Sequence, residues 1–280
     1  METKSWERVF EMDEQTMFAL MVDLHRDGAR QGPGSDAETL RALELTRLDR
    51  TAGLRVADIG CGTGASTLVL ARSLPNARID AVDLFPEFLH ILAERARQAG
   101  CLDRIETHVA SMDSLPFAAG SFDLIWSEGA IYNMGFSEGV EAWRPLLRPG
   151  GVIAVSEITW LRPDPPDEIR RHWEAEYPEI ATASEKIAVL ERAGYDLLGY
   201  LVLPSTDWID GYHEPIDNRL PAFLARHADR PEAAEIADLH RQESDLYRRY
   251  HDCFSYGFYV ARRRRSAWQD PAVRATLSPR

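Results

Sequence analysis

The stretch VADIGCGTGAS, residues 56–66, decides the fold of this chain. It is a hydrophobic segment that runs directly into a turn with glycine at three alternate positions, Gly60, Gly62 and Gly64. A buried strand that leads into such a turn and then into a helix is typical of nucleotide-binding α/β proteins. Glycine allows the backbone to approach a ligand where any Cβ would collide with it. The rest of the sequence has to identify the nucleotide.

Strand-like and helix-like segments alternate around this turn. Their apolar periodicity predicts strands over residues 54–59, 78–84, 104–110, 122–127 and 151–160. It predicts helices over residues 65–73, 86–99 and 137–147, and a short helix between the third and fourth strands. Such alternation indicates a parallel sheet with helices on both faces, in which ligands bind at the carboxyl ends of the strands.

The two ends of the chain are richer in helix. Helices are predicted over 11–27, from Ser35 onward, and over 165–180, 183–193 and 231–250, with capping boxes at Ser35–Glu38 and Thr182–Glu185. A late pair of strands, 196–204 and 253–262, flanks a helical insertion that we expect to act as a lid. The expected organisation is therefore N-terminal helices (1–50), core (51–204), insertion (205–252), final core strand (253–265) and tail (266–280).

Composition narrows the function classes. The chain has 280 residues, 45% of them hydrophobic, and a net charge of −13, which makes nucleic acid an unexpected partner. No apolar stretch is long enough to be a signal peptide or a membrane span, so we expect a cytoplasmic protein with no membrane partner. Three widely spaced cysteines and scattered histidines give no spacing typical of a disulfide framework or a metal site.

Three acidic residues, Asp83, Asp58 and Asp113, help to identify the nucleotide that the glycine turn binds. GCGTGA together with Asp83, 19 residues after Gly64, would also suit NAD, because an acidic residue there binds the ribose hydroxyls. However, Asp58 lies at the end of the first strand, where NAD-binding folds are usually apolar, and a buried carboxylate needs a positive partner or donors. An amino-acid ammonium group is one such partner. Asp113, after the third strand, is placed to accept from an adenine amino group.

Residues 50–160 resemble the class I S-adenosylmethionine (SAM)-dependent methyltransferases. The resemblance is carried in order and spacing by DIGCGTG, Asp83, the SMD turn, SFDLIWS and LLRPGGV. Within that class it is most similar to the type 11 domain of the ubiquinone and menaquinone biosynthesis C-methyltransferases. The resemblance implies an α/β, Rossmann-like fold with a seven-stranded, mostly parallel sheet whose last strand is antiparallel. It also implies SAM as the cofactor.

The resemblance further implies roles for individual residues. Asp83 would hold the ribose hydroxyls, with Leu84 packed on the adenine and Met112 and Asp113 at its edge. Ser127 and Glu128 would lie under the methionine and sulfonium. The methionine and ribose wall would consist of Asp58, Gly60, Cys61, Gly62 and Gly64.

The acceptor site is predicted from residues near the methyl group and in the variable segments. Glu128 and Tyr132 follow the fourth strand and are the candidate catalytic residues. We expect an apolar or aromatic small-molecule acceptor, since aromatic residues gather in the variable region; the candidate substrate-binding residues are His172, Trp173, Tyr177, Trp208 and Tyr212. His25 and His240 are expected to be surface or helix-capping groups. Transfer from an activated donor needs mainly alignment and exclusion of water.

Two alternatives remain open at this point. A non-catalytic SAM-binding protein would keep the glycine turn and the acidic residues but would form no S-adenosylhomocysteine (SAH). An NAD-dependent oxidoreductase would use the same turn and would change nicotinamide absorbance.

Overall fold

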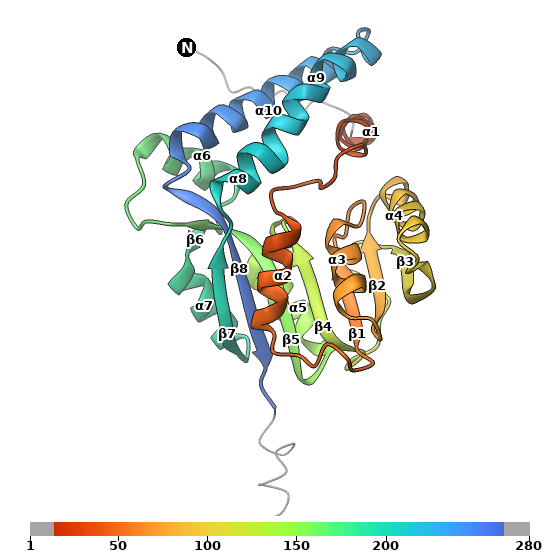
Figure 1. The fold of residues 1–280 in the computed structure, drawn as a ribbon. Helices are drawn as coiled ribbons and strands as arrows, with labels where there is room; N and C mark the ends of the chain where they lie inside the picture. Colours follow the sequence, from red (N-terminus) through yellow and green to blue (C-terminus); the bar gives the residue numbers. More distant parts are fainter. Residues whose placement is uncertain (1–13, 266–280) are drawn as a thin grey trace, which may run out of the picture.

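A mixed β-sheet forms the centre of the computed structural model, which describes residues 14–265 (Figure 1). Its strands are β1 (Arg55–Ile59), β2 (Arg78–Asp83), β3 (Ile105–Val109), β4 (Phe122–Glu128), β5 (Leu147–Trp160), β6 (Ala181–Thr182), β7 (Tyr195–Val202) and β8 (Phe254–Arg263). The order is β3-β2-β1-β4-β5-β8-β7, with β6 paired to β5. Strands β1 to β5 are parallel to one another, and β8 is antiparallel to both of its neighbours. The predicted Rossmann-like sheet with an antiparallel last strand is confirmed.

The seven strands in the order β3-β2-β1-β4-β5-β8-β7 agree with the predicted seven-stranded sheet. Residues 181–182 add the short strand β6, which pairs with the end of β5 and has too little periodicity to be recognised in the sequence. One detail of the prediction is wrong. The helix expected between β3 and β4 is absent from that connection, which contains only turns and irregular backbone. Pro116 and Gly120 lie in this connection and disfavour a helix there.

Helices cover both faces of the sheet and the carboxyl ends of its strands. The α-helices of the described residues are α1 (Glu14–His25), α2 (Asp36–Leu45), α3 (Ala65–Ser73), α4 (Pro86–Gln98), α5 (Phe136–Trp143), α6 (Asp167–Glu176), α7 (Ala183–Arg192), α8 (Ser205–Trp208), α9 (Glu214–Arg226) and α10 (Pro231–Tyr250). Apolar residues of α2, α3 and α4 pack on one face, and those of α5 and α7 pack on the other. Side chains alternate between the two cores along a strand: Leu124 and Trp126 face the first core, and Ile125 faces the second.

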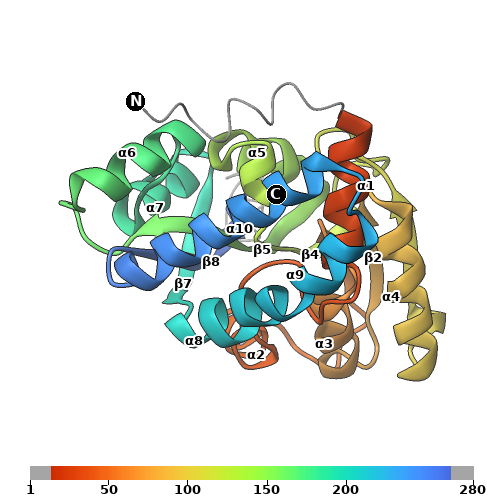
Figure 2. The same cartoon turned by 90° about the horizontal axis from the view of Figure 1, so that it is seen from above.

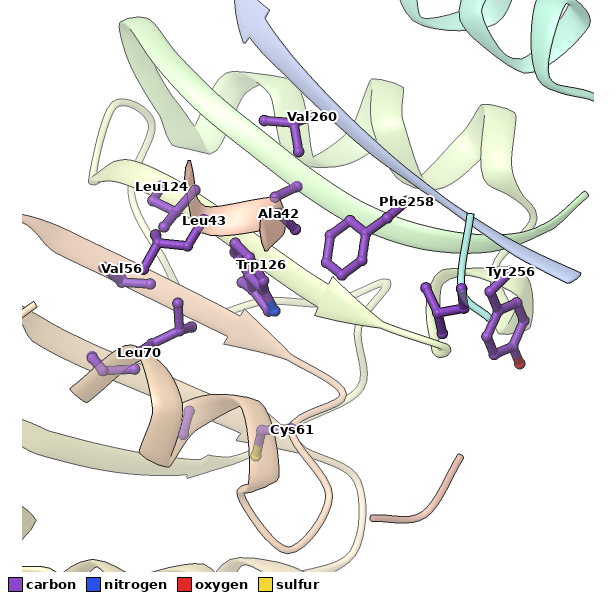
Figure 3. Packing of buried hydrophobic residues seen from close by; sticks show 14 of the residues in the cluster. Ala42, Leu43, Val56, Cys61, Leu70, Leu124, Trp126, Tyr256, Phe258 and Val260 are labelled. Atoms are coloured by element: carbon purple, nitrogen blue, oxygen red, sulfur yellow. The ribbon is translucent and has the colours of Figure 1, made fainter. Parts of the chain in front are cut away.

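Trp126 is the largest side chain at the centre of the first core. It is fully buried, and its ring lies 5.2 Å from that of Phe258 in β8. Figure 3 shows it beside Ala42 and Leu43 of α2, with Phe258 on its other side. The packing of Trp126 therefore joins β4, β8 and the N-terminal helix α2 into one core, close to the carboxyl end of β4.

One of the two predicted capping boxes is complete. At Thr182 the side chain and the Glu185 side chain both make the expected bonds, and α7 begins there. At Ser35 the hydroxyl accepts from the backbone N–H of Glu38, but the Glu38 carboxylate pairs with Arg41 instead of returning to the cap. Helix α2 therefore has a side-chain cap without the reciprocal bond.

A layer of helices lies over the carboxyl ends of the parallel strands. Helices α9 and α10 cross above this edge of the sheet, with α1 beside them (Figures 1 and 2). The three helices share a small core of their own, which includes Leu20, Phe223 and Ile236. Within the described residues, no helix is long and apolar enough to cross a membrane.

Candidate functional site

A cavity of about 390 Å³ opens at the carboxyl ends of β1, β2 and β4. The carboxyl ends of parallel strands are where α/β proteins bind ligands, because the loops diverge there. Most of the residues predicted to bind the cofactor or to act in catalysis line it: Gly60, Cys61, Gly62, Asp83, Leu84, Met112, Asp113, Glu128 and Tyr132. The structure thus brings the motifs quoted from the sequence to one cavity. Their individual roles remain predictions.

The glycine turn forms one wall of the cavity. Gly60, Gly62 and Gly64 have φ values of +72°, +54° and +89°, which side chains other than glycine rarely adopt. The N–H groups of Gly60 and Cys61 both donate to the carbonyl oxygen of Val82, which fixes the turn to β2. A Cβ on Gly64 would lie 2.1 Å from the Leu92 side chain in α4, so this glycine serves helix packing and does not line the cavity.

Asp83, the last residue of β2, joins the turn to the cavity. Its Oδ2 accepts from the Gly62 N–H at 2.7 Å, and its Oδ1 accepts from the Phe85 N–H at 3.0 Å. The residue is 8% exposed, and burial raises the pKa of its carboxyl above the usual value. Each carboxylate oxygen keeps a second lone pair, so Asp83 can also accept hydrogen bonds from a ligand in the cavity.

Asp58 lies behind the turn and does not line the cavity. It is fully buried, and its Oδ2 accepts from the hydroxyls of Ser66 (2.8 Å) and Thr67 (2.6 Å) in α3. Its Oδ1 has no partner within the described chain. Burial raises the pKa of Asp58 to about 7. The orphaned oxygen leaves this carboxylate with room for one donor from a ligand or a water.

Glu128, at the end of β4, accepts hydrogen bonds from three side chains. Its Oε2 pairs with Arg30 at 2.6 Å, and its Oε1 accepts from Thr39 (2.7 Å) and from Trp126 Nε1 (2.9 Å). Sequence reasoning missed Arg30, which also lines the cavity. Because donors occupy both oxygens, Glu128 acts as an anchor for residues 30–39 and is poorly placed to remove a proton.

The segment between α1 and α2 covers the glycine turn. Gln31 Oε1 accepts from the Thr63 N–H at 2.8 Å and lies 2.3 Å from the position of a Cβ on Gly62. Arg95 of α4 donates to the Gly28 carbonyl oxygen and to the Thr63 hydroxyl. The Gly-Pro-Gly at 32–34 was the only sequence signal for this segment, and it indicated a helix break without indicating a contact.

Aromatic residues frame the mouth of the cavity near Asp83. Phe18 of α1 meets Phe85 edge-on at 5.5 Å, and Phe85 meets Phe88 at 5.4 Å. All three line the cavity, and Leu84 beside them is 50% exposed. An exposed apolar rim beside the Asp83 carboxylate suits a flat, partly apolar ligand.

Ser127 and the residues expected on α6 lie outside the cavity lining. Ser127 is fully buried, with an Oγ that has no partner within the described residues. Trp173 packs on Phe254 at 5.2 Å, next to the half-buried His172. Tyr177 accepts from the Phe136 N–H, and its ring lies 6.3 Å from that of Tyr132, a lining residue.

The other two expected substrate residues lie deeper among the helices. Trp208 is 2% exposed, stacks on Tyr247 at 4.5 Å, and donates to the Ser255 hydroxyl. A side chain so fully packed belongs to the core, so its position lends no support to a substrate contact. Tyr212 lies between His25 and His240, with ring distances of 6.3 and 6.1 Å. Both histidines are buried where α1, α9 and α10 pack together, so neither is a surface group. The capping alternative holds for His25, the last residue of α1, whose Nδ1 lies 2.9 Å from the carbonyl oxygen of Met21.

One group of metal-type ligands occurs among residues 14–265, at Asp80, Glu106 and His108. Asp80 already pairs with Arg55 at 3.0 Å and with His108 at 2.9 Å. The ion pair with Arg55 and the hydrogen-bond contact with His108 already occupy the Asp80 carboxylate.

Sequence comparison identifies the domain. Residues 56–151 match the family model described as a methyltransferase domain. The chain is 35% identical over 107 residues to the erythromycin 3''-O-methyltransferase of Saccharopolyspora erythraea, an alignment covering 38% of this chain and 35% of that protein. It spans only 35% to 40% of the length of the curated relatives that it matches most strongly. The matching model is general, so the finer likeness to the quinone group remains a prediction.

Solved structures share the fold over nearly the whole chain. A SAM-dependent methyltransferase from Geobacter sulfurreducens, solved with S-adenosyl-L-homocysteine, superposes with a TM-score of 0.75 at 22% identity, covering 89% of this chain and 98% of that one. The [4+2]-cyclase SpnF superposes with a TM-score of 0.70 at 23% identity, covering 90% and 95%. The match of residues 56–151 to a methyltransferase domain argues against the NAD-dependent oxidoreductase that the glycine turn had left open. Residues 56–151 therefore match a methyltransferase domain, and the glycine turn and the acidic residues of the cavity lie within the matched residues.

Proposed function

We propose that this protein is a SAM-dependent methyltransferase that acts on a small-molecule acceptor. One observation carries the proposal: in a methyltransferase domain, the carboxylate at the end of β2 fixes the glycine turn and lines the same cavity. Asp83 and Gly62 are hydrogen-bonded to each other at this wall, which leaves carboxylate lone pairs for a ligand.

The cavity residues fit SAM in chemistry. Asp83 would accept from the ribose hydroxyls, and Leu84 with Phe85 would pack on the adenine, next to Met112 and Asp113. The unpartnered oxygen of Asp58 would receive the ammonium group of the methionine part, directly or through water. A buried carboxylate with an orphaned oxygen is stabilised by such a donor.

Catalysis on this proposal rests on positioning. SAM, when bound, supplies a methyl group already activated by its positive sulfur. The chain has to hold the acceptor atom in line with that group and exclude water. Glu128 and Arg30 order the segment that covers the glycine turn, and the Tyr132 hydroxyl is available to hydrogen-bond the acceptor atom. Burial raises the pKa of Tyr132, so its phenol stays protonated and can donate.

The acceptor would lie between Tyr132 and the helices above it. Helices α1, α9 and α10 would form the lid, and Tyr177 and Tyr212 would contact the acceptor from its sides. An apolar or aromatic acceptor is supported by the aromatic rings of this region. The resemblance to quinone-biosynthesis methyltransferases that the sequence predicts, and the erythromycin in one relative's name, are both consistent with such an acceptor.

A second candidate function is use of the bound cofactor without methyl transfer. It is favoured by Glu128, whose two oxygens already accept from other side chains, and by the likeness of the fold to a protein named as a cyclase. Such a protein would bind SAM and either act on a ligand or sense it, with no SAH formed.

Calorimetric titration with SAM and SAH, followed by an acceptor-library screen for SAH formation, tests both candidates. We expect micromolar binding of both nucleosides and SAH formation with at least one small-molecule acceptor. Binding without SAH, together with conversion of a compound to an isomer, would support the second candidate. Absence of binding of either nucleoside would overturn both.

A further inference from the structure

A second groove, of about 430 Å³, lies beside the cavity at the glycine turn. The segment between α1 and α2 forms one side of it, and α3 forms another (Figure 1). Three arginines line this groove, Arg30, Arg72 and Arg95, and we call it the arginine groove. Asp36 is the only carboxylate among the described residues of its lining. The groove is therefore a basic concave surface on a chain whose net charge is −13.

Carboxylates match the charges of two of these arginines. Arg30 Nη1 pairs with Glu128 at 2.6 Å, and Arg72 Nη2 pairs with Asp36 at 3.0 Å. Arg72 is exposed, and Asp36 is its only hydrogen-bond partner within residues 14–265. A guanidinium has five N–H donors, so Arg72 keeps several of them for a ligand.

Arg95, in the last turn of α4, has no carboxylate partner in the described chain. Its guanidinium donates to uncharged oxygens, the Gly28 carbonyl at 2.9 Å and the Thr63 hydroxyl at 2.6 Å. The side chain is half-buried, and burial lowers the pKa of its guanidinium. A partly buried charge without a counter-ion is costly, and an anion in the groove would offset that cost.

A second unmatched guanidinium approaches Gly28 from α9. Arg219 Nη2 lies 3.3 Å from the Cβ position of Gly28, whose carbonyl oxygen accepts from Arg95. Within residues 14–265 Arg219 forms no ion pair, and its buried Nε has no hydrogen-bond partner. Burial lowers the pKa of Arg219 too; the charge of the exposed Asp27 opposes this for both guanidiniums without forming an ion pair with either. Two uncompensated cations thus meet next to Ala29, a residue of the groove lining.

The amino ends of two helices also meet at the arginine groove. Asp36 is the first residue of α2 and Ala65 is the first residue of α3, and both line the groove. Gly64, which precedes α3, provides no side-chain cap for its first N–H groups. The positive end of a helix dipole attracts anions, so the helix ends add to the field of the arginines.

We propose that the arginine groove binds the phosphate group of a small molecule at Arg72 and Arg95. The two guanidiniums without a carboxylate partner, Arg95 and Arg219, suit the two negative charges of a phosphate monoester. The planar fork of arginine matches phosphate oxygens in geometry. Leu68, which lines the groove beside Arg72, offers the organic part of the ester an apolar contact. This inference goes beyond the proposed function, because it concerns a site outside the cofactor cavity.

Phenyl phosphate, inorganic phosphate and benzoate test the site by calorimetry at about pH 8, with and without saturating SAH. We expect phenyl phosphate to bind at least about tenfold more tightly than benzoate, and more tightly than inorganic phosphate. Arg72→Gln and Arg95→Gln should each weaken phenyl phosphate binding at least about tenfold. Arg97→Gln is the matched control on α4, since Arg97 is exposed and pairs with Glu94 outside the groove; it should change nothing. Thermal unfolding checks that each variant is folded.

The inference is overturned by absence of phenyl phosphate binding, by equal binding of benzoate, or by binding that survives Arg72→Gln in a folded protein. An equal loss in Arg97→Gln would show a non-specific effect of charge and would overturn it as well. Displacement of phenyl phosphate by SAH would place the ligand in the cofactor cavity instead. Equal or tighter binding of inorganic phosphate would overturn the assignment to an ester and identify free phosphate as the ligand. Failure of the proposed function is distinguishable: neither SAM nor SAH binds, while phenyl phosphate still does.

Discussion

Replacement of Asp83 is the most direct test of the cofactor assignment, because one carboxylate connects the turn, the strand and the cavity. Its Oδ2 holds the Gly62 N–H at 2.7 Å and its Oδ1 holds the Phe85 N–H at 3.0 Å. Asp83→Ala removes these acceptors together with the lone pairs that would bind the ribose hydroxyls. Asp83→Asn keeps the shape and one acceptor oxygen but removes the charge.

The expected magnitude follows from the bonds lost. A hydrogen bond to a charged acceptor contributes about 1.5–3 kcal/mol, and about 1.4 kcal/mol corresponds to a tenfold change in affinity. Loss of a single ribose bond therefore weakens SAH binding at least about tenfold, and loss of both weakens it further. We expect Asp83→Ala to show the larger effect and Asp83→Asn an intermediate one.

Isothermal titration calorimetry with SAH measures the effect, and thermal unfolding of each variant measures the structural cost. Asp103→Ala, an exposed carboxylate before β3, serves as the control and should bind as the wild type does. Unchanged affinity in Asp83→Ala would refute the ribose assignment. A collapse of the melting temperature in Asp83→Ala, with full SAH affinity in a still-folded Asp83→Asn, would show that the carboxylate only supports the turn.

Two further variants test the turn and the second core. Gly62→Val should abolish SAH binding, since its Cβ would meet Gln31 and the residue has φ +54°; Gly100→Val, with φ +68° and open space around it, should lose only stability. Glu157 is fully buried beside Lys186, and burial raises its pKa from 4.5 to about 7. Its contribution to stability is thus complete below about pH 4.5 and is lost as the pH rises through about 7. Urea unfolding from pH 5 to 8 should show a decline that is shallower in Glu157→Gln, and equal slopes would contradict the assignment.

The sequence alone was sufficient for the sheet and for one wall of the site. Alternating apolar periods predict strands and helices locally, and a parallel sheet follows from their order. The glycine turn could be recognised because positive φ at Gly60 and Gly62 is a local backbone requirement. Asp83 follows from the same logic, since a residue at the end of β2 has to meet the turn at the end of β1.

Only the tertiary structure decided the opposite wall of the site. Arg30 reaches Glu128 across 98 residues of sequence and leaves that carboxylate as an anchor. No local pattern encodes such a contact, which depends on how α2 packs against β4. For the same reason, aromatic spacing could not separate Trp208, which packs in the core, from Tyr132, which lines the cavity.

His240 shows the same division in one residue. The sequence predicted its helix over 231–250, and the structure has that helix at the same bounds. An isolated amphipathic helix, however, does not specify what its inward face will meet. That His240 meets the rings of Tyr212 and His213, from the segment after β7, is a consequence of the fold. Periodicity along the chain fixes which face of a helix turns inward, whereas the partners of that face are fixed only when distant segments pack together.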